Sequence, residues 1–219
     1  PGAQLTLRHG NDCQAYGNYF RNTDGLRIFG DRHLIHSNYF EGNTKGIDMG
    51  NGGAEVADGA KLTSHDRPDD CVVAFNTFIN NTHHYHMGGR TNGLGSLRAT
   101  IAYNLFVGPG NAATINPASP HTATWTGNVL WNISSPGALP ESGFTSQDPR
   151  ITADSSRIFR LSPESGMIDR ASGEFPAVNV DMDGQPRTGK RDVGADEYSS
   201  APIVAKFLTP ADVGPASVP

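Results

Sequence analysis

A short motif that recurs through the first two thirds of the chain most constrains how it can fold. In each copy an asparagine is followed two residues later by an aromatic or aliphatic residue, and the interval between copies is uneven. Where the copies are closest, the repeating unit is about 20 residues, which is too small to fold alone and is typical of a solenoid of stacked coils. The copies are Asn18-Tyr19-Phe20, Asn38-Tyr39-Phe40, Asn76-Thr77-Phe78, Asn104-Leu105-Phe106 and Asn128-Val129-Leu130.

A second column of residues indicates the type of solenoid. Glycine stands twelve residues after each of the first three asparagines, and the column continues with residues that tolerate positive φ. Short β-rich segments between such turns predict an all-β fold, a parallel β-helix with coils of about 20 residues. A β-sandwich is the rival, but Asn-Gly hairpin signals are sparse. The column holds Gly10, Gly30, Gly50, Gly88 and Asn116.

The register of these coils makes two predictions about the interior. The motif asparagines should form a hydrogen-bonded ladder, and Phe20, Phe40, Phe78 and Phe106 should form one interior stack. Cys13 and Cys71 each lie five residues before a motif asparagine. They would be two coils, about 9–10 Å, apart, which is too far for a disulfide, so both are expected to be reduced core residues.

Composition excludes several classes of protein. Gly (26) and Pro (15) are abundant in the 219 residues, which argues against a helical bundle. A net charge of −5 without a basic cluster argues against a nucleic-acid partner. No apolar run approaches the roughly 18 residues of a membrane span. Two cysteines cannot form a disulfide scaffold.

The chain divides into three predicted parts. Residues 1–144 should form the β-helix coils, residues 145–198 a closing segment over the last coil, and residues 199–219 an extended tail or linker. The chain opens on Pro1 without Met or a leader. We therefore expect a trimmed piece of a longer protein, in which an upstream segment stacks on the first coil, because the end of a solenoid needs a cap.

Two insertions predict a groove. Residues 51–70 and 89–97 both follow the glycine column, so the two loops should lie side by side and form one wall of a cleft. The residues expected to line it are His65, Arg67, Tyr85 and Arg90.

Two arginines are candidates for binding an anion. Arg8 lies two residues before the glycine column, in the column that continues with Ile28, Asp48, His86 and Thr114. The mixed polarity of that column suggests an outward face, although Ile28 breaks the pattern. Arg32 could hold a carboxylate with its planar fork. Either arginine could equally be a solvated surface residue that pairs with its neighbours.

Two further segments resemble metal sites without completing one. The run His83-His84-Tyr85-His86 has no Cys or carboxylate at ligand spacing, so we expect groove or surface histidines and no zinc. Asp181-Met182-Asp183-Gly184 begins like a calcium loop, but the bidentate Glu at position 12 is missing, so a turn is expected. We predict no metal site within the chain.

These motifs together resemble polysaccharide lyase family 6, which contains alginate lyases and chondroitinase B. The resemblance covers about residues 3–198 and is carried mainly by Arg8-His9-Gly10 and Gly30-Asp31-Arg32-His33. It implies a right-handed parallel β-helix, secretion or a periplasmic location in a bacterium, an acidic polysaccharide as substrate, and calcium as a cofactor. The motif Asp192-Val193-Gly194-Ala195-Asp196-Glu197 is similar too, but many secreted β-helix proteins share it.

The chemistry that the resemblance implies is β-elimination on a uronate. A calcium ion neutralises the uronate carboxylate, a lysine removes the C5 proton, and an arginine lies near the glycosidic oxygen. Arg8 matches the catalytic arginine, His9 its neighbour, and Arg32 a substrate-binding arginine. The family's lysine and its calcium ligands would precede Pro1, and Lys45 and Lys61 lie in the wrong coils.

The sequence therefore predicts part of a polysaccharide lyase, inactive or incomplete as this chain alone. Alginate is the preferred substrate and dermatan sulfate the alternative. A noncatalytic carbohydrate-binding or structural β-helix module remains open, because fold alone does not confer function.

Overall fold

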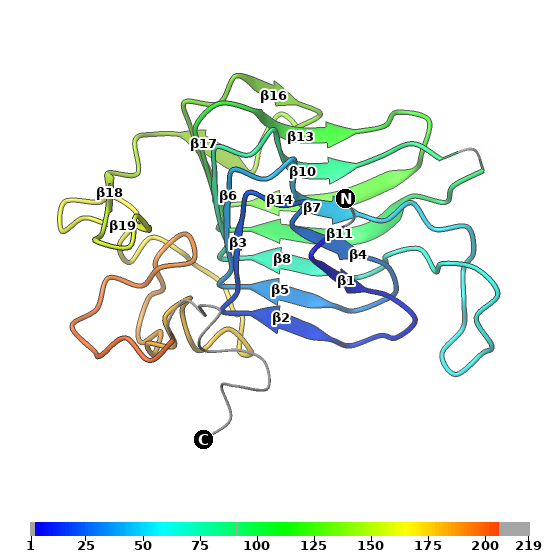
Figure 1. Cartoon of the computed structure of the whole chain (residues 1–219), viewed down its shortest axis with the longest axis horizontal. Helices are drawn as coiled ribbons and strands as arrows, with labels where there is room; N and C mark the ends of the chain where they lie inside the picture. The colour runs from blue at the N-terminus through cyan, green and yellow to red at the C-terminus, as the bar shows by residue number, and fades with distance from the viewer. Residues whose placement is uncertain (1–2, 91, 206–219) are drawn as a thin grey trace.

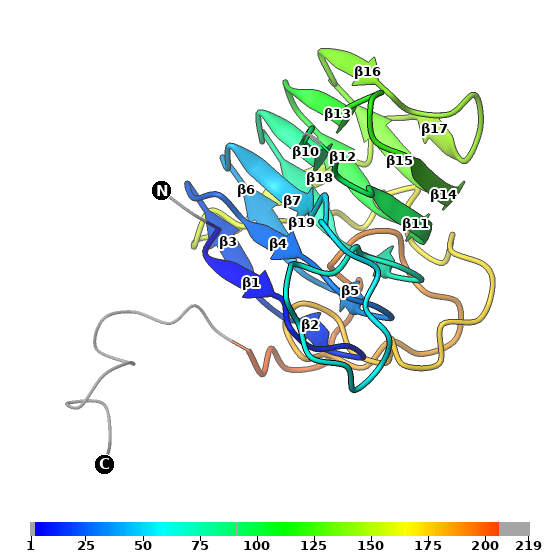
Figure 2. The same cartoon turned by 90° about the vertical axis from the view of Figure 1, so that its right-hand side faces the viewer.

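The computed structural model describes residues 3–90 and 92–205 and shows a parallel β-solenoid. Three parallel sheets run along it, with six, five and six strands (Figures 1 and 2). Each coil contributes one strand to each sheet, except that the last coil, with β16 and β17, has no strand in the second sheet. The parallel β-helix predicted from the repeat is confirmed. In every sheet the neighbours are strands of successive coils, as in the order β1-β4-β7-β10-β13-β16.

The strands are short, as the repeat implies. The first sheet contains β1 (Leu5–Leu7), β4 (Leu26–Ile28), β7 (Lys45–Met49), β10 (His83–Met87), β13 (Asn111–Ile115) and β16 (Ser135–Gly137). The second contains β2 (Gln14–Tyr16), β5 (Leu34–His36), β8 (Val72–Ala74), β11 (Ser96–Ala102) and β14 (His121–Thr126). The third contains β3 (Tyr19–Arg21), β6 (Tyr39–Glu41), β9 (Thr77–Ile79), β12 (Leu105–Val107), β15 (Asn128–Trp131) and β17 (Phe144–Ser146). An antiparallel pair, β18 (Ile151–Ala153) and β19 (Phe159–Leu161), follows.

The motif asparagines form the predicted ladder at one corner of the solenoid. Asn38 Nδ2 donates to Asn76 Oδ1 at 3.0 Å, and Asn76 Nδ2 donates to Asn104 Oδ1 at the same distance. Asn38 and Asn76 also donate to backbone carbonyls of their own and the preceding coil, as Asn76 does to Ala74 and Ile35. Because the amide satisfies buried backbone groups in two coils, asparagine is needed at this turn.

The predicted phenylalanine stack is also confirmed. The rings of Phe20, Phe40, Phe78 and Phe106 lie parallel inside the third sheet, with successive centroids 4.9, 4.8 and 4.9 Å apart. The last three side chains are fully buried. One aromatic ring per coil therefore fills the interior at the spacing of parallel strands.

One cysteine departs from the expectation. Both thiols are free as predicted, and Cys71 is buried, but Cys13 is exposed. The two residues do share a column through His33, because Leu34 N donates to the Cys13 carbonyl and Val72 N to the His33 carbonyl. Cys13 belongs to the first described coil, whose strands lie at the edges of the sheets, so no further coil covers its side chain in this structure.

The column that was predicted to contain Arg8 is wrong at its first two members: Thr6 stands in place of Arg8, and Arg27 in place of Ile28. Within the first sheet Leu5 pairs with Leu26, and Leu26 pairs with Ile47, so each of these first two steps is one position longer than the assumed repeat. Ile28 therefore pairs with Leu7 and Met49 in the interior, which explains why it broke the polar pattern. The outward column contains Thr6, Arg27, Asp48, His86 and Thr114.

The segment after the coils lies along the side of the solenoid, whereas the sequence analysis placed it over the last coil. Gly194 N donates to the Tyr103 carbonyl, Ala195 N to Thr77 Oγ1, and the Ser37 hydroxyl to the Val180 carbonyl. These contacts reach three successive coils. They close a second apolar cluster outside the solenoid, around the aromatic rings of Phe75 and Tyr103.

Only part of the predicted tail, residues 199–219, lies within the described residues. Residues 199–205 are irregular, and Val204 N donates to the Asp183 carbonyl at 2.8 Å. Residues 206–219 lie outside the described part of the chain. Among the described residues, no helix is long and apolar enough to cross a membrane.

Candidate functional site

The two inserted loops lie side by side, as their common insertion point predicted; residue 91 of the second loop lies outside the described residues. Leu94 N donates to the Gly52 carbonyl at 2.8 Å, and Gly95 N donates to Asn51 Oδ1 at 2.8 Å. Arg67 takes part in the same contact, since its Nη2 donates to the Leu94 carbonyl at 2.6 Å and its Nη1 lies 3.4 Å from Glu55. Arg67 therefore ties the loops together, and its guanidinium is engaged within this chain.

Three of the predicted residues line a cleft of about 390 Å³, which we call the basic pocket. His9 follows β1, His65 lies on the 51–70 loop, and Arg90 lies on the 89–97 loop. His9 Nε2 and His65 Nδ1 are 3.3 Å apart, so one ring donates a hydrogen bond to the other. The ring of His65 packs on Phe29 at a centroid distance of 4.6 Å. The solenoid thus brings together side chains that lie far apart in the sequence.

The charges around this pocket are positive. Burial lowers the pKa of His65, and so do the positive charges of Arg8, His9, Arg90 and Arg27. His65 is therefore neutral near pH 7 and can accept a proton or a hydrogen bond. Arg8 and Arg90 are exposed, and within the described part of the chain no carboxylate forms an ion pair with either. Unpaired guanidinium groups beside a cleft favour an anionic ligand.

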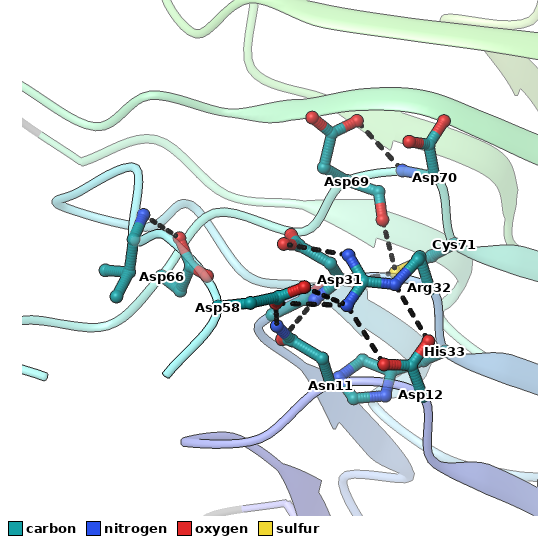
Figure 3. A network of polar contacts seen from close by, with 12 residues as sticks. Asn11, Asp12, Asp31, Arg32, His33, Asp58, Asp66, Asp69, Asp70 and Cys71 are labelled. Atoms are coloured by element: carbon teal, nitrogen blue, oxygen red, sulfur yellow. Dashed lines mark hydrogen bonds and ion pairs between the residues drawn. The ribbon is translucent and has the colours of Figure 1, made fainter. Parts of the chain in front are cut away.

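A second cleft adjoins the first under the tip of the 51–70 loop. It measures about 410 Å³, and we call it the loop cleft. His9 lines both clefts, so they share a wall. Arg32 lies here, and its fork is engaged: Nε and Nη2 donate to Asp12 at 2.8 and 2.9 Å, and Nη2 also donates to Asp58 at 2.9 and 3.0 Å (Figure 3). Arg32 thus pairs with carboxylates of its own chain, as the surface interpretation expected.

Arg32 belongs to a column of alternating charge where the chain enters the second sheet; its last member, Arg98, lies at an irregularity within β11. Asp12, Arg32, Asp70 and Arg98 occupy equivalent positions of four coils, with φ of 58°, 55°, 51° and 48°. Arg98 holds Asp70 as Arg32 holds Asp12, with both oxygens engaged. A left-handed backbone at each turn aims these side chains along the stack, and the alternation places opposite charges on neighbouring coils.

Asp31 is an incompletely satisfied carboxylate beneath the loop cleft. Its Oδ1 is buried without a hydrogen-bond partner among the described residues. Burial is the largest cause that raises the pKa of Asp31 to about 6, and the negative charges of Asp66 and Asp69 add to it against the attraction of Arg32. A charge at Asp31 is therefore opposed by the loop that carries Asp66.

Tyr85 does not line a groove, which corrects the sequence prediction. Its side chain is fully buried inside the solenoid, where its ring meets Trp125 edge-on at 5.4 Å. The reason is its column, because Tyr85 pairs with Ile47 and Ala113, both of which point inward. His84 is buried too, so only His83 and His86 of that run reach the outer face.

Asp48 organises the outer face of the first sheet. It accepts hydrogen bonds from Arg27 at 2.9 Å, Lys45 at 3.1 Å and His86 at 2.7 Å, which come from β4, β7 and β10. Burial alone would raise the pKa of Asp48, but the hydrogen bond from His86, the charge of Lys45 and the hydrogen bond from Arg27 outweigh it and lower the pKa to about 2. The sequence analysis missed Arg27, which the corrected register would have revealed.

Asp48→Asn should therefore destabilise the protein by about 2 kcal/mol at pH 7, because folding lowers the pKa of the Asp48 carboxyl from its ordinary 3.8 to about 2. The contribution is present above pH 4 and is lost as the pH falls toward about 2. Urea unfolding of wild type and Asp48→Asn should show a difference in the free energy of unfolding that is largest at pH 7 and becomes smaller below pH 4. Glu141→Gln, at an exposed position, is the control. A gap that does not change with pH would contradict the account.

Asp181, Asp183 and Asp196 bring ligand oxygens within 4.8 Å of one another in the closing segment. Their oxygens are already engaged. Arg160 forms ion pairs with Asp183 and Asp196, and Asp181 accepts backbone N–H groups. This donor set has its own counter-cation. It also belongs to the closing segment, whereas the basic pocket is lined by residues that follow β1 and by the two loops.

Comparisons with known proteins agree with the fold and with the sequence motifs. The family model described as Chondroitinase B matches residues 2–138. A solved structure of a mutant of AlyGC, a PL6 family alginate lyase, matches with a TM-score of 0.58 and 22% identity. The match covers 74% of this chain and 23% of that chain, so this chain spans about a quarter of the solved protein. No curated protein sequence matches.

Proposed function

The chain belongs to the chondroitinase B family of polysaccharide lyases, and on that premise we propose that it forms part of a lyase that cleaves a uronate-containing polysaccharide by β-elimination. Alginate is the proposed substrate and dermatan sulfate the alternative. Both are polyanions, so both need a positively charged cleft on a protein whose net charge is −5. We also propose that the protein acts outside the bacterial cytoplasm, where such polysaccharides occur.

The convergence of basic side chains from three coils at one pocket carries this proposal. His9, His65 and Arg90 line the basic pocket, and the charges of Arg8 and Arg27 reach it. None of the residues that line this pocket is acidic. A site with this charge attracts a carboxylate, and its position between two loops on a rigid scaffold suits an extended chain.

In this proposal Arg8 stabilises the oxygen that leaves when the glycosidic bond breaks. Elimination removes the proton at C5, forms the C4–C5 double bond and expels the C4 oxygen with the bonding electrons. The leaving oxygen needs a positive charge or a proton, and the donors of an unpaired guanidinium supply that charge. His9 and the neutral His65 would donate hydrogen bonds to the sugar or accept them from its hydroxyl groups.

The residues beside Arg8 do not form a calcium site. Calcium needs several oxygen ligands, whereas the basic pocket offers imidazole and guanidinium nitrogens. The Asp181–Asp183–Asp196 cluster already holds Arg160. A calcium ion beside Arg8 would take its ligands from outside this chain, so we derive no step through it.

A noncatalytic carbohydrate-binding module is the second candidate, because neither Lys45 nor Lys61 is placed as a base at the basic pocket. Proton removal needs a base, and Lys45 is engaged with Asp48 at 3.1 Å. Lys61 is exposed on the 51–70 loop and lines neither cleft. Such a module would use the basic pocket to bind the same polyanion without cleaving it.

Arg90→Ala tests the site under either candidate. Loss of one unpaired guanidinium should weaken binding to alginate by about threefold to tenfold, because the ligand loses a charged hydrogen-bond donor. Affinity electrophoresis in gels that contain alginate measures this. Arg98→Ala is the matched control, since it removes the same charge from a side chain held by Asp69 and Asp70. Equal effects of the two substitutions would contradict a specific site at the basic pocket.

A further inference from the structure

The loop cleft contains a contact that the proposed function does not use. Asp58, near the tip of the 51–70 loop, is held by donors from two coils. Arg32 Nη2 donates to both of its oxygens, and Asn11 Nδ2 donates to Oδ1 at 2.5 Å (Figure 3). All three residues line the loop cleft. The two donors form a carboxylate-binding site, and a carboxylate of the chain itself fills it.

We propose that Asp58 is an internal competitor for a substrate carboxylate, so that the 51–70 loop is a lid which an anionic polysaccharide displaces from Arg32 and Asn11. This inference rests on the proposed function, since the competing ligand is the uronate chain. Exchange of one carboxylate for another leaves the charge around Arg32 unchanged, and the pairing with Asp12 stays in place. The ion pair that opening breaks joins two side chains that are both exposed to water.

The position of the cleft supports this role. His9 forms a wall of both clefts, so a sugar in the basic pocket lies next to the loop cleft. Uronate polymers carry a carboxylate on every sugar or every second sugar. A neighbouring residue of the bound chain would therefore present its carboxylate toward the donors that hold Asp58.

The lid is also poised to open. Asp58 and its neighbour Asp12 are largely exposed, with side-chain exposures of 65% and 64%, and ion pairs of this kind are weak in water. Beneath the loop, Asp31 Oδ1 is buried without a partner among the described residues and faces Asp66 and Glu55 of the loop and Asp69 of the turn before β8. Above pH 6 the charge on Asp31 opposes closure, because Asp66 and Glu55 of the loop repel it against the attraction of Arg32.

Two measurements on the full chain test the proposal. Trypsin cleavage after Lys61, which is exposed on the same loop, reports opening without reference to activity. Calorimetry with an alginate tetrasaccharide reports binding. Asp58→Asn should increase the cleavage rate and tighten binding by about threefold to tenfold. Without the Asp58 carboxylate, Arg32 and Asn11 hold the loop less well, so the open, binding-competent state is more populated. The tetrasaccharide should accelerate cleavage of the wild type and leave Asp58→Asn unchanged.

Two variants of equal charge act as controls. Glu55→Gln removes one negative charge from the same loop, forms an ion pair only with Arg67 among the described residues, and exerts the weakest of the repulsions that act on Asp31. It should therefore change both readouts much less than Asp58→Asn. Asp31→Asn also removes one charge but should slow cleavage, because it relieves the repulsion under the closed loop. An effect of Glu55→Gln as large as that of Asp58→Asn would show that the loss of one negative charge explains the result, and it would overturn the proposal.

The remaining outcomes separate the lid from the proposed function. If the wild type binds the tetrasaccharide and Asp58→Asn binds it equally, within about twofold, the lid is overturned and the polysaccharide site stands. Binding by Asp58→Asn alone would support an autoinhibitory lid. If neither protein binds alginate or dermatan oligosaccharides, the proposed function fails and the competition fails with it.

Discussion

Replacing Phe40 with alanine should lower the free energy of unfolding by about 3–5 kcal/mol, one of the largest effects expected of a single substitution here. Phe40 is fully buried, and its ring stacks between Phe20 at 4.9 Å and Phe78 at 4.8 Å. The substitution removes a central member of the stack and leaves a cavity between two coils. Because the rings on either side are held by their own coils, the surrounding strands can close that cavity only by disrupting the register.

Urea denaturation at neutral pH measures this effect. Phe40→Leu should cost less than the alanine variant, since it fills part of the cavity. Tyr198→Ala, at a side chain that is 49% exposed, should stay within about 0.5 kcal/mol of wild type. A loss below about 1 kcal/mol for Phe40→Ala would contradict the stacked interior.

The repeat made the fold predictable, because no other residue type could take the place of those that carry it. An asparagine that bonds two coils and a phenylalanine that stacks on its counterpart must recur at each coil, whatever the length of the loops between them. The same logic would have found a second ladder that the sequence analysis missed. Thr23 N donates to Asn43 Oδ1, and Asn43 N donates to Asn81 Oδ1, with the same spacings of 20 and 38 residues.

Errors arose where one residue decided the facing of a side chain. The first sheet advances by one position more than the assumed repeat in each of its first two steps, so the interior column of Ile28 was exchanged for the outward column of Arg27. Tyr85 was misplaced because its histidine neighbours suggested a surface, whereas its paired residues Ile47 and Ala113 are apolar. Comparison of each column across coils would have corrected both.

The site was predictable only in part. Common insertion points indicated that the two loops would meet, and this brought His65 and Arg90 to His9. The partners of Arg32 were not accessible in the same way. Asp12 lies one coil away and was open to inspection, but Asp58 reaches Arg32 through the conformation of a long loop, which spacing does not encode.

Arg8→Ala should reduce the rate of polysaccharide cleavage by about 10²–10³, because removal of a donor that stabilises a developing oxyanion has an effect of that size. Arg8→Lys should be nearly as impaired, since a point charge does not reproduce the planar fork. Substrate binding should change much less than turnover, because the interaction with the leaving oxygen develops as the bond breaks. Arg98→Ala serves as the control of equal charge, at a side chain held by Asp69 and Asp70.

The most direct test of the lyase site is the ultraviolet absorbance of the unsaturated product, followed during incubation of the whole gene product with alginate and, separately, with dermatan sulfate. The account predicts product from one of these polymers with the wild type and with Arg98→Ala, and a rate lower by about 10²–10³ with Arg8→Ala. Turnover of Arg8→Ala close to wild type would remove Arg8 from the mechanism. Binding of either polymer by the wild type without any product would contradict the lyase and leave a carbohydrate-binding solenoid.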